Sequence, residues 1–183
     1  MKELRLRFTG ATPLLMHSGQ LANPLNKFSK AIKKVSGKRN KTDADHEEMA
    51  RLEWYGGLYL DEAGKIAVPG EIVEAALKDA AKKMKLGKAV DKALWCMKTT
   101  PLDIGVTYGD LAELYPKYSL TVSARIKNNR VQRTRPKFDV WSFEAVLNYD
   151  EHILEKESII QFASEASIGD WRPRFGRTKV EIV

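Results

Sequence analysis

Residues 168–177, with the sequence IGDWRPRFGR, combine side chains that bind phosphate with side chains that stack on flat rings. Arginine forks match phosphate oxygens, aromatic faces accept bases, and glycine lets another backbone approach closely. We therefore predict a loop that holds a polyanion through Arg172, Arg174 and Arg177. The alternative is an ordinary surface turn with solvated arginines. Trp171 and Phe175 either stack on bases or fix the loop against the core.

Two further segments concentrate positive charge with no acidic residue inside them. The first consists of Lys27, Lys30, Lys33, Lys34, Lys38, Arg39 and Lys41. It is either the solvated face of a helix, a partner of the acidic helix that follows, or a binding surface. The second consists of Arg125, Lys127, Arg130, Arg133, Arg135 and Lys137, on a predicted loop between two strands. Six like charges on one loop repel one another, so we expect a polyanionic partner there.

From these segments we select candidate nucleic-acid contacts. They are Lys27, Lys30, Lys34, Lys38 and Arg39 in the first segment, all six cations of the second, and Arg172, Arg174 and Arg177 in the C-terminal loop.

Composition limits the partner and the compartment. The 183 residues carry a net charge of +7, which favours nucleic acid first and an anionic membrane second. No apolar run approaches the roughly 20 residues that span a bilayer, and the N-terminus lacks the apolar stretch of a signal peptide. One cysteine and three histidines permit no internal disulfide and argue against a zinc site. We expect a cytoplasmic protein without metal or cofactor.

The basic sites favour a single strand over a duplex. The apolar helix faces are all needed for a core, and the strongest basic site is a loop, so no helix is free to enter a major groove. The octamer of the RNA-recognition motif is absent. We therefore expect Trp141, Phe143, Leu147 and Tyr149 to lie in the core rather than to form a stacking platform.

One histidine suggests catalysis as an alternative. His17 lies in a Ser-Gly loop and could act as general acid or base in metal-independent RNA cleavage. A lone loop histidine is more often structural, and Asp43 and Asp45 suit a helix start better than a magnesium site. No nucleotide-binding or hydrolase motif is present. The sequence leans against an enzyme.

The periodicity predicts the elements that position these side chains. Strands are expected around residues 4–8, 58–60, 65–68, 104–106, 120–126 and 140–149 and from Thr178 onward. Helices are expected from Asn23-Pro24 to Gly37, from Thr42 or Asp43, from Pro69-Gly70 to Met84 with Gly87 as cap, over residues 88–97, and from Ser158 to Ala166. Without its insertions the order is strand, helix, strand, strand, helix, strand. This order predicts an α+β, ferredoxin-like split βαβ fold. We expect one domain over residues 1–183, with an insertion at about residues 20–68 and a basic thumb-like loop at 127–138.

Three segments carry a resemblance to a known family. They are LLMHSG at residues 14–19, DEAGKIAVPGEIVEAAL at 61–77, and the glycine–arginine loop at 168–177. Together they resemble the RAMP superfamily, the ferredoxin-like RNA-binding proteins of CRISPR effector complexes, and above all its backbone subunits. The resemblance implies that residues 127–137 form the thumb, that residues 172–177 lie in the glycine-rich loop, and that RNA is preferred to DNA. It also implies assembly of copies along one strand. The chain departs from the family in its short length, in Glu71–Glu74 where the family is serine-rich, and in the Trp and Pro of its loop.

The leading hypothesis is a non-catalytic binder of single-stranded nucleic acid that acts in antiviral defence, as a homo-oligomer or as a subunit of a larger ribonucleoprotein. Two alternatives stay open. One is the metal-independent endoribonuclease that uses His17. The other is a phage-type adaptor or inhibitor that mimics a RAMP subunit and docks on a CRISPR complex.

Overall fold

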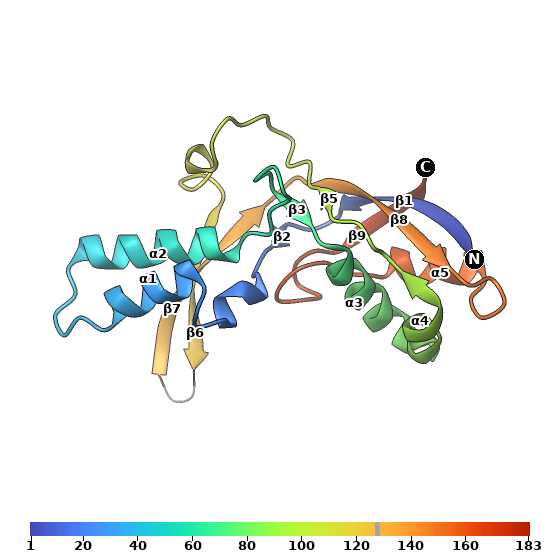
Figure 1. The fold of residues 1–183 in the computed structure, drawn as a ribbon, viewed down its shortest axis with the longest axis horizontal. Helices are drawn as coiled ribbons and strands as arrows, with labels where there is room; N and C mark the ends of the chain where they lie inside the picture. Colours follow the sequence, from blue (N-terminus) through green and yellow to red (C-terminus); the bar gives the residue numbers. More distant parts are fainter. Residues whose placement is uncertain (127–128) are drawn as a thin grey trace. The chain divides into compact units, whose positions relative to one another are not determined.

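The described residues, 1–126 and 129–183, form an α+β structure, as predicted. Over these residues the computed structural model has five α-helices and three antiparallel sheets (Figure 1). The chain divides into two compact units. Unit 1 comprises Met1–Leu15, Tyr59–Val106 and Phe138–Val183, and unit 2 comprises Met16–Leu58 and Thr107–Lys137.

A four-stranded sheet is the centre of unit 1. Its strands are β1 (Lys2–Gly10), β4 (Leu94–Trp95), β8 (Ser142–Tyr149) and β9 (Thr178–Ile182), in the order β4-β8-β1-β9. All neighbouring strands pair antiparallel, and Leu6 at the middle of β1 lies opposite Ala145 of β8 and Ile182 of β9. The short strand β2 (Leu14–Leu15) follows β1.

One face of this sheet is buried because apolar and polar residues alternate along its strands. In β1, Leu4, Leu6 and Phe8 are buried while Arg5 and Arg7 are exposed. The ring of Phe8 stacks on that of Phe143 at 4.9 Å. Trp141, Phe143, Leu147 and Tyr149 are each at most 4% exposed, which confirms the prediction that they belong to the core.

Helices α3 (Gly70–Ala81) and α5 (Lys156–Ser164) lie on the same side of the sheet (Figure 1). They bury their apolar faces there, Val73, Leu77 and Ala80 from α3 and Ile159 and Phe162 from α5. The predicted start of α3 at Pro69-Gly70 is confirmed. The predicted N-cap Ser158 is wrong, because α5 begins at Lys156 after Glu155.

Helix α3 ends at Ala81, earlier than predicted. A 3₁₀ turn, Lys82–Met84, follows α3, and Lys85 then takes a left-handed φ of 61°. Gly87 is therefore not a C-cap; it begins α4 (Gly87–Ala93). The helix predicted over residues 88–97 ends at Ala93, because the next two residues pair with the edge of the sheet as β4.

The small hairpin predicted at residues 58–68 forms: Leu60 bridges Ile66, and the amides of Asp61 and Ala67 donate to the carbonyls of Lys65 and Tyr59. Strand β3 (Ala67–Val68) also pairs with β5 (Thr100–Pro101). The predicted strand at residues 104–106 does not form; Asp103 makes one isolated bridge with Ser142.

Unit 2 is built on a pair of helices, α1 (Lys27–Ser36) and α2 (Asp43–Gly57), which lie side by side (Figure 1). The predicted N-cap Asn23 of α1 is wrong, because the side chain of Asn26 accepts the bond from the Phe28 amide. Residues Gly19–Ala22 before it form a 3₁₀ turn, as do Leu111–Glu113. The α2 start is confirmed: Thr42 is the N-cap and forms a capping box with Asp45.

The predicted basic loop at residues 127–137 is wrong as a loop. Its described part belongs to strand β7 (Asn129–Phe138), which pairs antiparallel with β6 (Ser119–Ile126). Leu120 lies opposite Arg135 and Thr121 opposite Thr134. The threonine hydroxyls are hydrogen-bonded at 2.9 Å.

Within the described residues, no helix is both long and apolar enough to cross a membrane.

Gly70 offers a test of the framework of unit 1. A Cβ at this position would lie 1.6 Å from the Cys96 carbonyl oxygen, so Gly70→Ala must push two backbone segments apart. We expect a loss of about 3 kcal/mol in the free energy of unfolding, measured by denaturant titration. Gly19→Ala is the control, because nothing lies within 4 Å of its added methyl group. Equal stability of the two variants would contradict this packing.

Candidate nucleic-acid interface

The excess positive charge of the chain belongs to unit 2. Its segments contain 15 lysines and arginines but only seven aspartates and glutamates, a net charge of +8. The whole chain carries +7, so unit 1 carries −1. If charge were spread evenly, each unit would carry a share in proportion to its size. Unit 2 is therefore the candidate interface.

Helix α1 presents lysines to solvent because its apolar residues all face inward. Phe28, Ile32 and Val35 follow helical spacing and are half-buried or buried. The exposed lysines of α1 are Lys27, Lys30, Lys33 and Lys34. Lys27 lies 5.0 Å from the centre of the Phe28 ring. Among the described residues, Lys30, Lys33 and Lys34 have no carboxylate partner, and neither does the exposed Arg39 after the helix.

Lys38 has a structural partner. Its Nζ lies 2.5 Å from Oδ1 of Asp45, which is 7% exposed. The other carboxylate oxygen accepts bonds from the backbone N–H and hydroxyl of Thr42. The Lys38 hydrogen bond, followed by that from the Thr42 amide, lowers the pKa of Asp45 from 3.8 to about 2. Of the first basic segment, Lys38 thus joins α1 to α2.

A buried carboxylate joins the other basic element to α2. Glu53, 5% exposed, accepts a hydrogen bond from Arg133 Nη1 at 2.6 Å and another from the Thr134 backbone N–H at 2.7 Å. Its two oxygens thus satisfy one charge and one amide of β7. Arg133 is therefore a structural residue, whereas Arg130 on the same strand is exposed and has no carboxylate partner within the described part of the chain.

Three further candidates of this segment, Arg125, Arg135 and Lys137, lie on β6 and β7. Arg135 and Lys137 are half-buried on β7. The Arg125 backbone lies in β6, opposite Arg130. Lys127 lies outside the described residues.

The third basic segment, the C-terminal loop, lies in unit 1 and is fixed by its backbone. Gly169 and Gly176 have φ values of +86° and +73°, in the region that favours glycine. A Cβ on Gly176 would lie 1.7 Å from the Ile168 carbonyl oxygen. The amides of Asp170 and Gly176 donate to the carbonyls of Leu15 and Pro13. The two glycines that bracket Arg172 and Arg174 thus hold the loop against the segment after β1.

The arginines of this loop have different surroundings. Arg172 pairs with Asp79 of α3 at 3.2 Å and donates to the Ser167 carbonyl. Arg174 lies 5.8 Å from the centre of the Phe175 ring, and Arg177 Nε donates to the Pro173 carbonyl. Among the described residues, Arg174 and Arg177 have no carboxylate partner.

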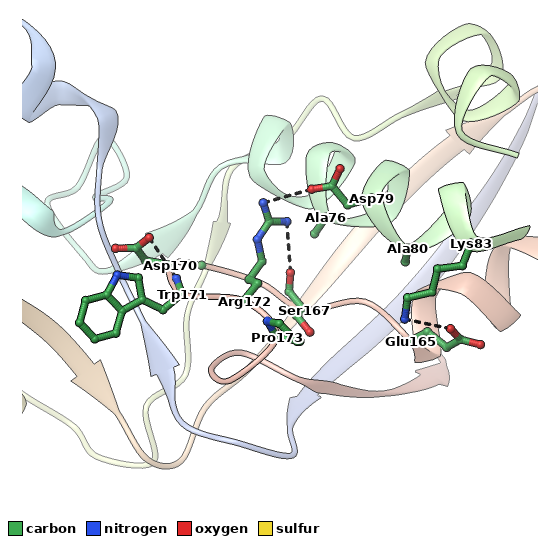
Figure 2. Close-up of a pocket in the computed structure, with 11 residues that line it drawn as sticks. Ala76, Asp79, Ala80, Lys83, Glu165, Ser167, Asp170, Trp171, Arg172 and Pro173 are labelled. Atoms are coloured by element: carbon green, nitrogen blue, oxygen red, sulfur yellow. Dashed lines mark hydrogen bonds and ion pairs between the residues drawn. The ribbon is translucent and has the colours of Figure 1, made fainter. Parts of the chain in front are cut away.

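A pocket of about 560 Å³ lies between α3 and the loop (Figure 2). Figure 2 shows Arg172 reaching across to Asp79, and Lys83 of the 3₁₀ turn facing Glu165 at 3.3 Å. Since each cation already has a carboxylate, the pocket has no free positive charge to attract phosphate. Arg172 stabilises the loop rather than presenting an open phosphate site.

The residues considered for catalysis or metal binding are scattered. His17 is half-buried after β2, and His46 is exposed on α2. Asp45 is committed to Lys38 and Thr42. In residues 1–126 and 129–183, no group of three or more His, Cys, Asp or Glu side chains is placed to hold a metal ion.

Glu53 is a structural residue of the candidate interface that sequence reasoning missed. Asp43, Asp45, Glu47 and Glu48 suit the start of α2, where acids interact favourably with the helix dipole, but this pattern does not distinguish Glu53. Its role depends on β7, 80 residues further along the chain. The only local signal is an acid next to Trp54, which is fully buried.

Sequence comparisons find no protein-family model that matches the chain and no curated protein that is significantly similar to it.

The Lys38–Asp45 pair predicts a specific dependence of stability on pH. The pKa of Asp45 is about 2 in the folded state and near 3.9 when unfolded, so this carboxylate stabilises the fold above about pH 4. That contribution is lost as the pH falls through 2. Lys38→Ala should remove most of this acid-dependent loss, whereas Lys34→Ala should leave it intact. Thermal unfolding between pH 6 and pH 2 measures it, and parallel curves for the two variants would contradict the assignment.

Arg133 and Arg130 form a matched pair for stability. Arg133→Ala leaves the Glu53 charge buried without its partner and should cost about 2–3 kcal/mol of unfolding free energy. Arg130→Ala should change it by less than about 0.5 kcal/mol. Adding Glu53→Gln to Arg133→Ala should recover part of the loss, because the amide oxygen still accepts from Thr134 and carries no charge. Chemical denaturation of the four proteins checks this, and equal losses for both arginines would refute it.

Proposed function

We propose that the chain is a non-catalytic binder of single-stranded nucleic acid and that the basic surface of unit 2 grips the phosphate backbone. The observation that carries the proposal is the charge of +8 confined to this unit. Like charges on one folded unit repel one another, and a chain of phosphates removes that repulsion while it releases counterions. RNA is the preferred strand in this proposal, and the protein acts as an oligomer or in a larger assembly.

The distribution of acids supports this proposal. Two of the seven acids of unit 2, Asp45 and Glu53, are buried, and they pair with Lys38 and Arg133. The cations with no carboxylate partner in the described part of the chain include Lys30, Lys33 and Lys34, which follow one another along α1. The spacing of these three lysines suits several contacts with one phosphate chain.

The order of elements supports a ferredoxin-like assignment for unit 1. The sheet order β4-β8-β1-β9, with α3 between β1 and β4 and α5 between β8 and β9, supports a split βαβ frame. We propose this fold and, on the same grounds, a distant relation to the RAMP backbone subunits. In that relation the β6–β7 hairpin takes the place of the thumb, and the C-terminal loop takes the place of the glycine-rich loop.

The proposal predicts a steep salt dependence that resides in α1. Each lost phosphate contact lowers the slope of log K against log salt by about 0.7 for a single strand. The triple variant Lys30→Gln, Lys33→Gln, Lys34→Gln should therefore weaken binding and reduce the slope by about 1–2. The measurement is fluorescence anisotropy with a labelled uridine oligomer from 50 to 300 mM salt.

The matched control is the triple variant Lys88→Gln, Lys92→Gln, Lys98→Gln. It removes the same charge from exposed lysines of unit 1. We expect its slope to equal that of the wild type. If both variants lose the same slope, only total charge matters and unit 2 is not the interface. If the wild type binds no strand at 50 mM salt, the proposed function fails.

A further inference from the structure

Trp171 is the one exposed ring in an otherwise covered set. The chain has 16 tryptophans, tyrosines and phenylalanines, all within the described residues. Trp171 is 39% exposed, and every other aromatic side chain is half-buried or buried. This includes all aromatic residues of unit 2, so the unit with the excess charge presents no fully exposed ring.

The backbone of Trp171 is held in place although its ring is not buried. Its φ of 52° lies in the left-handed region, which is unfavourable for a bulky side chain and occurs where the surroundings enforce it. The Asp170 carboxylate accepts a hydrogen bond from the Trp171 amide at 3.0 Å, and the Trp171 carbonyl accepts one from the Phe175 amide at 3.3 Å. In Figure 2 the indole points away from Arg172 and Asp79. The loop therefore fixes an apolar ring that is partly exposed to water.

The two aromatic residues of the loop have different environments. Phe175 is half-buried, with its ring centre 6.3 Å from that of Trp171. Phe175 packs against the loop, so Trp171 is not needed to cover the core. The exposed Arg174, which lies over the Phe175 ring, has no carboxylate partner among the described residues.

We infer that Trp171 stacks on a base of the single strand that the chain is proposed to bind. This inference rests on the proposed function and adds a second kind of contact to it. Every base offers an apolar face to an indole, and Arg174 of the same loop offers a guanidinium suited to phosphate. A loop that carries both an exposed ring and an arginine with no carboxylate partner among the described residues matches a nucleotide better than it matches an apolar protein surface. The phosphate contacts of unit 2 and the base contact of unit 1 are then separate terms in binding.

The test compares a uridine oligomer with an abasic strand of the same length and charge. One base–aromatic stack corresponds to roughly a 5- to 100-fold difference in affinity. The wild type should bind the uridine oligomer tighter than the abasic strand by a factor in this range. Trp171→Ala should bring the two affinities together without changing the abasic affinity or the salt slope. Trp171→Phe, which keeps a ring, should retain most of the difference.

Met97→Ala is the matched control, because Met97 is a large apolar residue of unit 1 that is 79% exposed. It should bind both strands as the wild type does. A second readout is the tryptophan emission that is lost in Trp171→Phe. This emission should be quenched by the uridine oligomer and not by the abasic strand.

The outcomes separate the two proposals. If Trp171→Ala weakens both strands equally, or neither, the stacking inference is wrong while the proposed function stands. The inference is also overturned if Trp171→Ala changes the oligomeric state and not the preference for bases, because the ring then contacts protein. If the wild type binds neither strand, the proposed function itself fails.

Discussion

Electrostatic repulsion within unit 2 decides where its buried acids are needed. Fifteen cations and seven acids occupy its two segments, and a compact unit with that balance is destabilised by its own charge. The structure places two of the acids where they stabilise most. Glu53 and Asp45 are buried, and each accepts hydrogen bonds both from a cation and from the backbone. Lys30, Lys33, Lys34, Arg39 and Arg130 remain exposed, with no carboxylate partner in the described part of the chain.

Within each basic segment of unit 2, some cations pair with a buried acid of the fold and others have no such partner among the described residues. Lys38 and Arg133 join elements of unit 2 through buried carboxylates, whereas Lys34 and Arg130 lie close to them in sequence and face solvent. Charge density alone marks all four as equivalent. The same division applies in unit 1, where Arg172 holds the C-terminal loop to α3 and Arg174 remains exposed. A basic residue is thus a better candidate contact when no acid of the fold accounts for it.

Much of the frame followed from local patterns, because those patterns are decided by near neighbours. The alternation of Leu4, Leu6 and Phe8 predicted β1, and Pro69-Gly70 predicted the start of α3. The predictions were wrong where residues far away in the sequence determine the local conformation. The density of arginine suggested a loop where β7 forms, because the strand gains its stability from β6 and from Glu53 of α2. Asn23 and Asn26 are equally good caps by type, and only the hydrogen bond to the Phe28 amide distinguishes them.

The role of Trp171 could not be predicted from a local sequence pattern either. An aromatic residue between arginines is compatible with packing or with stacking, and the sequence alone left both open. The structure assigns the packing role to Phe175 and leaves the indole of Trp171 exposed on a backbone with a left-handed φ.

A fold that holds a strained residue in order to expose an apolar ring loses free energy twice, in the backbone and in the hydration of the ring. Such a loss is retained when a ligand covers the ring, since the bound state then recovers the hydrophobic part. The aromatic residues of unit 2 are all half-buried or buried, so no ring of that unit is exposed in this way. A base stacked on Trp171, as proposed, would cover the indole and account for its exposure.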